Sequence, residues 1–234
     1  MPGSLAIPAR FNGPLQSGNG GYCSGAFAGF LEGPAEVSLR APVPLETPLA
    51  VERDGDDALR VLDGETLIAE AGAAPELQVE VPEPVSSQEA RRAAERYRGL
   101  PDGPFSRCFV CGRAREDALG VFAGEVEGRE LVASPWTPPA WAADESGHVL
   151  PELVWAVLDC PTFFAAYLGE ELPISFLVRL GARIDAPVLA GEEHVVIAWP
   201  TGVEGRKRWA GSAVLSGDGK VLAAAHALMV EPRD

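Results

Sequence analysis

The stretch LPELVWAVLDCPTFFA, residues 150–165, carries the plainest helical pattern in this sequence. Its apolar residues recur at intervals of three and four, which predicts one broad face suited to burial in a core. Pro151 stands where a first-turn proline is tolerated, and Glu152 follows where a negative charge interacts favourably with the helix dipole. The segment therefore predicts a central helix that carries one carboxylate, Asp159, among apolar neighbours.

Segments with the pattern of strands surround this helix. Asp218-Gly219 is a hairpin signal between the last two of four long strands, which we expect over residues 174–184, 193–200, 208–215 and 221–230. Earlier in the chain, residues 21–31 predict a shorter helix that is thin because it is rich in glycine and alanine, so another backbone can approach it closely. Its strands are expected at 35–45, 49–53, 58–62 and 66–73, with 76–81 as an extension of the sheet.

The sequence contains an internal repeat. Three segments recur in the same order: 11–14 as 136–139, 39–49 as 178–188, and 62–71 as 217–225. We interpret the chain as two homologous halves, residues 1–82 and 105–234. The connector, residues 83–104, contains the capping box Ser86-Ser87-Gln88-Glu89, which opens a basic helix predicted over 90–98.

Composition excludes several classes of function. The 234 residues include 34 acidic and 19 basic side chains, a net charge of −15, which repels phosphate backbones and anionic lipid. We therefore expect neither nucleic-acid binding nor a role at a membrane surface. Four cysteines are too few for a disulfide scaffold, and neither a secretory signal nor a membrane-spanning run is evident. The expected compartment is the cytoplasm.

An apolar helix wrapped by an antiparallel sheet, in two copies, resembles the double hot-dog arrangement of acyl-CoA thioesterases. Residues 108–112 (CFVCG) and 118–121 (ALGV) are similar to the opening of thioesterases of the phenylacetate-pathway (PaaI-like) type. Residues 150–159 resemble their central helix, which usually begins His-Gly-Gly and carries an acid nine residues after the His. The resemblance implies an α+β fold, a double hot-dog in which two antiparallel sheets each wrap a central helix.

Each half departs from this pattern in a different way. In residues 18–22 (GNGGY), Asn19 occupies the place of the family His, and the residue nine positions later is Ala28, so the first helix has the glycines but no acid. The second helix has Asp159 but lacks the glycines. The resemblance thus implies one composite site between the halves. A shifted alignment would instead place His148 at the family His.

Thioester hydrolysis needs a donor for the carbonyl oxygen and a base for water. A backbone N–H at a helix N-terminus can receive the developing negative charge, and Gly21 is the expected donor. Asp159 is the expected base or nucleophile, since desolvation would raise its pKa. Glu152 and His148 are alternative acid–base residues; a dipole partner and a loop residue are the simpler interpretations of these two.

The ligand is expected to lie beside the glycine loop. The acyl chain would contact aromatic residues that are core residues on the simpler interpretation, and a basic hairpin could meet the phosphates of coenzyme A. The expected substrate-binding residues are Gly20, Tyr22, Phe27, Phe30, Trp155, Phe163 and Arg206, with Phe164, Arg40 and Arg179 as further candidates.

The pair Cys108 and Cys111 has the spacing of a metal knuckle, but a structural zinc site needs four ligands and no second pair exists. Cys23 and Cys160 fall on the predicted helices and are not expected to join it. We therefore predict an ordinary pair of thiols and no metal site. No nucleotide-binding motif is evident, so no cofactor is expected.

The sequence supports three hypotheses. The first is an acyl-CoA thioesterase-like hydrolase in which a carboxylate helps water attack the thioester. The second is a non-catalytic hot-dog module that binds acyl-CoA or another apolar ligand. The third, a dehydratase or hydratase, would need a histidine beside the acid, and only His148 is available. The fused halves predict a monomer that acts as an internal pseudo-dimer, or a homodimer of such chains.

Overall fold

The computed structural model describes residues 3–14, 16–99, 102–103 and 105–233. Strands make up most of the regular structure, and short 3-10 turns at Ala9–Phe11 and Ala140–Ala142 precede two of the helices. The helices are α1 (Gly20–Ala28), α2 (Ser87–Ala94) and α3 (Pro151–Ala166). The strands are β1 (Gly3–Leu5), β2 (Ala35–Leu39), β3 (Leu49–Arg53), β4 (Ala58–Asp63), β5 (Thr66–Ala73), β6 (Gly124–Glu125), β7 (Val132–Trp136), β8 (Phe176–Ile184), β9 (His194–Glu204), β10 (Lys207–Leu215) and β11 (Val221–Val230).

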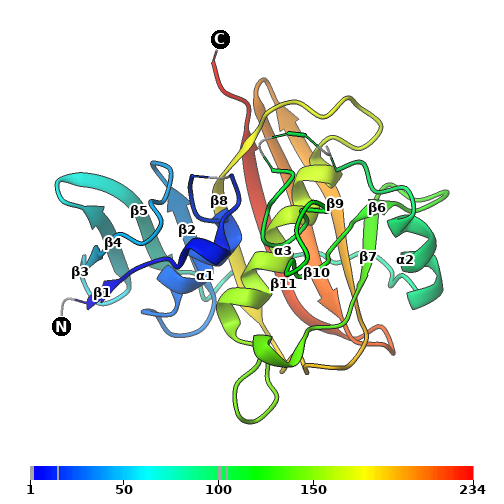
Figure 1. Ribbon diagram of the computed structural model, residues 1–234, viewed down its shortest axis with the longest axis horizontal. Helices are drawn as coiled ribbons and strands as arrows, with labels where there is room; N and C mark the ends of the chain where they lie inside the picture. The colour runs from blue at the N-terminus through cyan, green and yellow to red at the C-terminus, as the bar shows by residue number, and fades with distance from the viewer. Residues whose placement is uncertain (1–2, 15, 100–101, 104, 234) are drawn as a thin grey trace.

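The strands form one antiparallel sheet in the order β1-β3-β4-β5-β2-β8-β11-β10-β9-β7-β6 (Figure 1). Residues 3–73 supply one block of this sheet and residues 124–230 supply the other. Each block repeats one topology, because β1-β3-β4-β5-β2 corresponds strand by strand to β7-β9-β10-β11-β8. The blocks join where β2 pairs with β8, with Val37 opposite Leu180. Each half therefore covers the edge strand of the other, and the two sheets expected from the sequence are joined into one.

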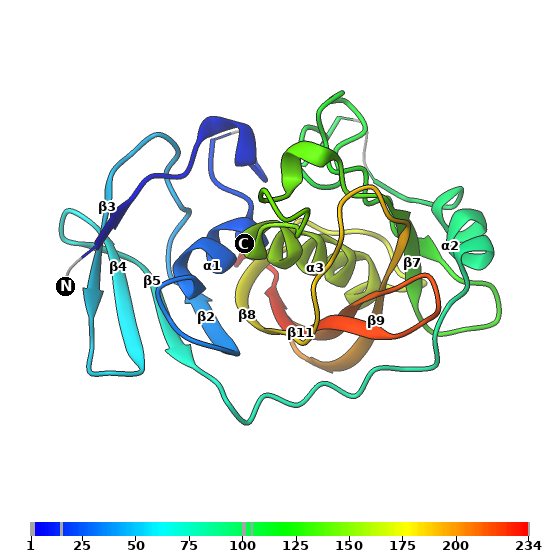
Figure 2. The same ribbon diagram turned by 90° about the horizontal axis from the view of Figure 1, so that it is seen from below.

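The central helices α1 and α3 lie side by side on one face of the sheet (Figure 2). Successive residues of β9 show how the two faces differ. Val196 belongs to the large core under α1 and α3, whereas Ile197 belongs to a smaller core on the opposite face. There Ala90 and Ala93 of α2 pack against the sheet. The capping box at Ser86 and Glu89 is present as predicted, although α2 begins and ends earlier than residues 90–98.

Several predicted boundaries are wrong. The first helix ends at Ala28 and not at residue 31. Strand β2 ends at Leu39, and prolines at 42 and 44 lack the N–H that would extend its ladder. Residues 76–81 form no strand, because β5 already pairs with β4 on one edge and with β2 on the other.

None of the helices in the described ranges is long and apolar enough to cross a bilayer.

Candidate active site

The N-terminus of α1 points at the middle of α3. Asn19 caps α1, and its Oδ1 accepts a hydrogen bond of 2.9 Å from the N–H of Tyr22. The N–H of Gly21 donates a hydrogen bond of 2.8 Å to Oδ2 of Asp159. The structure therefore brings together the glycine loop of the first half and the carboxylate of the second.

The two helices approach closely because α1 has glycines on the face toward α3. A Cβ on Gly21 would lie 2.5 Å from Cβ of Asp159 and 2.6 Å from the carbonyl oxygen of Trp155. One turn later, a Cβ on Gly25 would lie 2.6 Å from Cα of Glu152. Such distances leave no room for a side chain, so these glycines set the separation of the helices.

Burial dominates the electrostatics of Asp159. The residue is 6% exposed, and burial raises the pKa of its carboxyl from the usual 3.8 to about 7. The hydrogen bond from Gly21 lowers this pKa in part, and negative charge on Cys108 raises it. Asp159 is thus a carboxylate that gains and loses its proton near neutral pH, as a general base requires.

The N–H of Gly20 is the second donor at this helix end. As the first residue of α1, Gly20 has no intrahelical acceptor. Among the described residues, no protein group accepts a hydrogen bond from this N–H. Gly20 lines the cavity described below, next to Asp159. The Gly21 N–H, which sequence analysis expects to bind the carbonyl oxygen, is instead occupied by the carboxylate.

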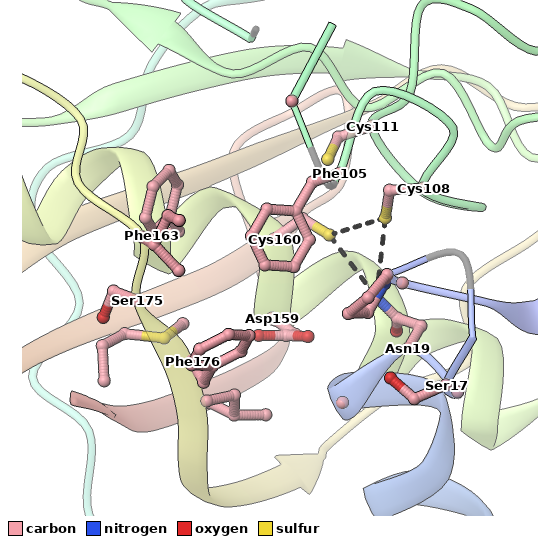
Figure 3. Close-up of a pocket in the computed structure, with 18 of the residues that line it drawn as sticks. Ser17, Asn19, Phe105, Cys108, Cys111, Asp159, Cys160, Phe163, Ser175 and Phe176 are labelled. Carbon is pink, nitrogen blue, oxygen red and sulfur yellow. Dashed lines mark hydrogen bonds between the residues drawn. The ribbon is translucent and has the colours of Figure 1, made fainter. Parts of the chain in front are cut away.

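Asp159 opens onto a cavity of about 420 Å³ whose lining is largely apolar (Figure 3). The cavity lies between the two halves of the chain. The first half contributes the loop before α1 and the residues after β2; the second half contributes the loop near residue 105, the middle of α3 and the start of β8. The labelled lining residues in Figure 3 are Ser17, Asn19, Phe105, Cys108, Cys111, Asp159, Cys160, Phe163, Ser175 and Phe176.

A ring buried in the core holds the 105–112 loop in place. Phe109 is fully buried, its N–H donates to the carbonyl of Asn12 (2.9 Å), and its ring packs edge-on against Phe11 at 4.8 Å. The hydroxyl of Tyr97 donates a hydrogen bond of 2.6 Å to the carbonyl of Cys111. These contacts fix the loop whose residues Phe105, Cys108 and Cys111 line the cavity.

This loop brings Cys108 and Cys111 to Cys160 on α3. The three Sγ atoms lie within 4.8 Å of one another, and those of Cys108 and Cys160 are 3.7 Å apart. Nδ2 of Asn19 lies 3.8 Å from Sγ of Cys108 and 3.6 Å from that of Cys160. The expectation that Cys160 cannot join the pair is wrong, because anchoring of Phe109 in the core carries the loop over α3. Cys23 lies buried in α1, outside this group.

The structure gathers some of the expected site residues and separates the others. The expected residues that line the cavity are Asn19, Gly20, Asp159 and Phe163, with the further candidate Phe164. Gly21 lies behind them and donates its N–H to Asp159. The other expected residues are not among the lining residues: Glu152, His148, Tyr22, Phe27, Phe30, Trp155 and Arg206.

These other residues have identifiable surroundings. Tyr22 stacks on Phe11 at 4.0 Å. Phe27 is fully buried, and Trp155 packs against Gly25. The exposed His148 lies in the loop before α3, where its N–H donates to Asp144. Tyr22, Phe27 and Trp155 therefore pack within the protein, and His148 lies in an exposed loop.

Phe30 follows α1, and Arg206 lies between β9 and β10. The ring of Phe30 fills the space beside Gly3 of β1. Arg206, at the β9–β10 turn, donates to the carbonyl of Glu231. Both positions are separate from the wall of the cavity.

Several residues that line the cavity were not predicted from the sequence. Phe105, Phe176 and Leu177 supply apolar wall, and the exposed Arg113 lies at its edge. Arg40, which the sequence suggested as a possible phosphate contact, also lines the cavity. The aromatic pair 105 and 176 lies outside any helical pattern, so periodicity could not identify it; the rings meet at 6.1 Å only in the folded chain.

Comparisons with known proteins support the fold. No protein-family profile matches this sequence, and no curated protein is significantly similar to it. Solved structures do match, at low identity. A tesB protein from Mycobacterium avium subspecies paratuberculosis has a TM-score of 0.62 at 13% identity, covering 99% of this chain and 93% of its own.

Two further structures illustrate the range of these matches. A conserved protein of unknown function with a hot dog fold, from Alicyclobacillus acidocaldarius, has a TM-score of 0.60 at 15% identity, covering 100% and 94% of the two chains. An acyl-CoA thioesterase II from Mycobacterium marinum has a TM-score of 0.51 at 13% identity, covering 86% and 80%. At such identities the likeness shows that this chain shares the hot-dog fold, which hosts more than one activity.

Proposed function

We propose that this protein hydrolyses an acyl thioester, such as an acyl-CoA, in the cavity between its two halves. The observation that carries the proposal is the placement of a buried carboxylate, Asp159, at the N-terminus of α1 and at the wall of an apolar cavity. A structural neighbour that is an acyl-CoA thioesterase II supports this chemistry by analogy of fold.

The cavity has features that suit each part of such a substrate. Its apolar wall, which includes Phe105, Phe163 and Phe176, would hold the acyl group. The guanidinium groups of Arg40 and Arg113 are exposed at the lining and would meet the phosphates of the coenzyme. Arg40 is paired with Glu70 at 2.6 Å, so phosphate binding there would replace an exposed ion pair.

The chemical step would use both donors at the end of α1. The Gly20 N–H donates a hydrogen bond to the carbonyl oxygen of the thioester, with support from the helix dipole, while the Gly21 N–H orients the carboxylate of Asp159. Asp159 takes a proton from water as the oxygen of that water attacks the carbonyl carbon. The tetrahedral intermediate then collapses, the C–S bond breaks, and the thiolate leaves and is protonated.

Asp159→Asn tests this proposal with Glu152→Gln as its matched control. Both substitutions remove one carboxylate from α3, but only Asp159 lines the cavity. Turnover of short, long and aromatic acyl-CoAs is followed by loss of thioester absorbance and by chromatography of free coenzyme A. Thiol-reactive dyes are avoided because the protein has free cysteines. We expect kcat to fall by about 100-fold or more in Asp159→Asn and to stay within about twofold in Glu152→Gln. Equal activity of wild type and Asp159→Asn would remove this residue from the mechanism.

The non-catalytic module remains the alternative, and the same panel separates the two. Binding of an acyl-CoA by calorimetry with no hydrolysis would favour a binding protein. A hydratase or dehydratase has less support, since none of the three histidines lines the cavity.

A further inference from the structure

The three thiols of Cys108, Cys111 and Cys160 form a cluster that thioester hydrolysis does not require. Two of them come from the 105–112 loop and the third from α3, and all three line the cavity (Figure 3). Cys108 and Cys111 are buried and Cys160 is half-buried. Their Sγ atoms lie within 4.8 Å of one another, although the residues are up to 52 positions apart in sequence.

The spacing of the sulfur atoms fits a single thiophilic cation. Zinc binds thiolate sulfur at about 2.3 Å in a tetrahedron, so two sulfur ligands of one ion are about 3.8 Å apart. The Sγ atoms of Cys108 and Cys160 are 3.7 Å apart. Small side-chain rotations of Cys111 would bring its sulfur to the same separation from both.

Nitrogen donors lie beside the sulfur atoms of the cluster. The N–H of Val110 donates a hydrogen bond of 3.4 Å to Sγ of Cys108, and Nδ2 of Asn19 lies at 3.8 Å from Cys108 and 3.6 Å from Cys160. Such N–H···S contacts offset the charge of thiolate ligands in metal sites.

The backbone after Cys111 is bent tightly around the first cysteine. The N–H of Gly112 donates to the carbonyl of Cys108 (2.9 Å), and a Cβ at Gly112 would lie 2.6 Å from both the N and the O of Cys108. Only glycine fits at this point. The turn thus presents the two sulfur atoms of the loop on the same side, toward Cys160.

We infer that Cys108, Cys111 and Cys160 bind one Zn²⁺ through three thiolates, with the fourth position open to the cavity. Zinc prefers such soft ligands in tetrahedral geometry, and its binding would release the thiol protons to solvent. Since all three sulfur ligands line the cavity, a water molecule or a ligand group there would complete the tetrahedron. The ion would tie the 105–112 loop to α3 beside Asp159. This inference is independent of the proposed hydrolysis.

Metal binding by the full chain, free of any histidine tag, tests the inference. The protein is reduced, stripped with a chelator and titrated with Zn²⁺ against a chromophoric competitor, then with Co²⁺ for spectroscopy. We expect one equivalent to bind, with visible bands typical of tetrahedral Co²⁺ and thiolate-to-metal charge transfer in the near ultraviolet. X-ray absorption at the zinc edge of the wild type should show three sulfur ligands.

Variants identify the ligands. Cys111→Ser and Cys160→Ser should each weaken Zn²⁺ binding by more than about tenfold. Cys23→Ser is the matched control, because this buried cysteine lies on α1 outside the cluster, and it should bind one equivalent as tightly as the wild type.

Two results would overturn the inference: no stoichiometric metal on the reduced wild type, or unchanged affinity in Cys160→Ser. The wild-type absorption measurement decides the matter even if a serine variant does not fold. Asp159→Asn should bind Zn²⁺ as the wild type does, whether or not it hydrolyses thioesters. Loss of metal binding would therefore count against the zinc site alone, and unchanged hydrolysis would count against the role of Asp159 alone.

Discussion

The main-chain N–H of Gly21 donates a 2.8 Å hydrogen bond to Oδ2 of Asp159, across 138 positions of sequence. This bond joins the glycine-rich helix of the first half to the acidic helix of the second. It also lowers the pKa of a carboxyl group whose pKa burial raises to about 7.

Gly21→Ala should destabilise the protein and lower any activity that depends on Asp159. The added Cβ would lie 2.6 Å from the backbone oxygen of Trp155, which cannot move without displacing α3. We expect a loss of roughly 1–3 kcal/mol in the free energy of unfolding, measured by chemical denaturation.

Gly29→Ala is the matched control for this change. Gly29 has φ −60°, and the nearest atom to its Cβ position is 3.5 Å away. It should stay within about 0.5 kcal/mol of the wild type. Equal stability of the two variants would show that α1 and α3 are not as close as described.

Activity should depend on pH through the proton of Asp159. Because a general base must be ionised and this pKa is about 7, kcat/KM should rise about tenfold per pH unit below 7 and level off above it. The profile is measured on protein with one defined metal content, since charge on Cys108 also affects this pKa. A flat profile between about pH 5 and pH 9 would contradict a general-base role.

Asp159→Asn should be more stable than the wild type at neutral pH. Burial raises the pKa of Asp159, so the folded state holds this proton more tightly than the unfolded state, and wild-type stability falls as pH rises from about 4 to about 7. Asparagine cannot ionise, and its carbonyl can still accept from Gly21. The stability advantage of the variant should therefore grow over this interval and then stay constant, as measured by denaturation at a series of pH values.

Glu170→Gln provides a control of opposite sign. The hydrogen bonds from Arg208 lower the pKa of Glu170, so this carboxylate stabilises the wild type above its usual pKa of 4.5 and loses that effect as pH falls. The variant should be slightly less stable at neutral pH, with a gap that closes on acidification. If the stability of both variants relative to the wild type changed with pH in the same direction, the pH dependence seen with Asp159→Asn could not be assigned to ionisation of Asp159.

Phe163→Ala should shift the proposed thioesterase activity toward larger acyl groups. Its ring lines the cavity between Phe105, at 6.4 Å, and Tyr167, at 5.4 Å, so truncation enlarges the apolar space. The ratio of kcat/KM for a long to a short acyl-CoA should rise about tenfold. Phe30→Ala removes a half-buried ring that does not line the cavity and should leave this ratio unchanged.

The architecture was largely predictable because it depends on local pattern. The apolar periodicity of residues 150–165 predicts α3, which the structure has at Pro151–Ala166, and alternation predicts β5 and β11 to the residue. The small residues of the first helix, Gly25 among them, predicted a close approach of another backbone, and α3 makes that approach. The errors occurred where pairing with a neighbouring strand determines whether a segment forms a strand. Residues 76–81 have strand character, but no edge of β5 is free to pair with them.

What the sequence by itself determined is the set of elements and two of the groups that meet at the site, Gly21 and Asp159. The elements followed from spacing within single segments, and the two groups followed from the resemblance to hot-dog thioesterases. The tertiary structure alone decided which aromatic rings line a cavity and which form the core. It alone also brought Cys160 to the 105–112 loop. The reason is that contacts between distant segments depend on the packing of anchors such as Phe109, which spacing along the chain does not encode.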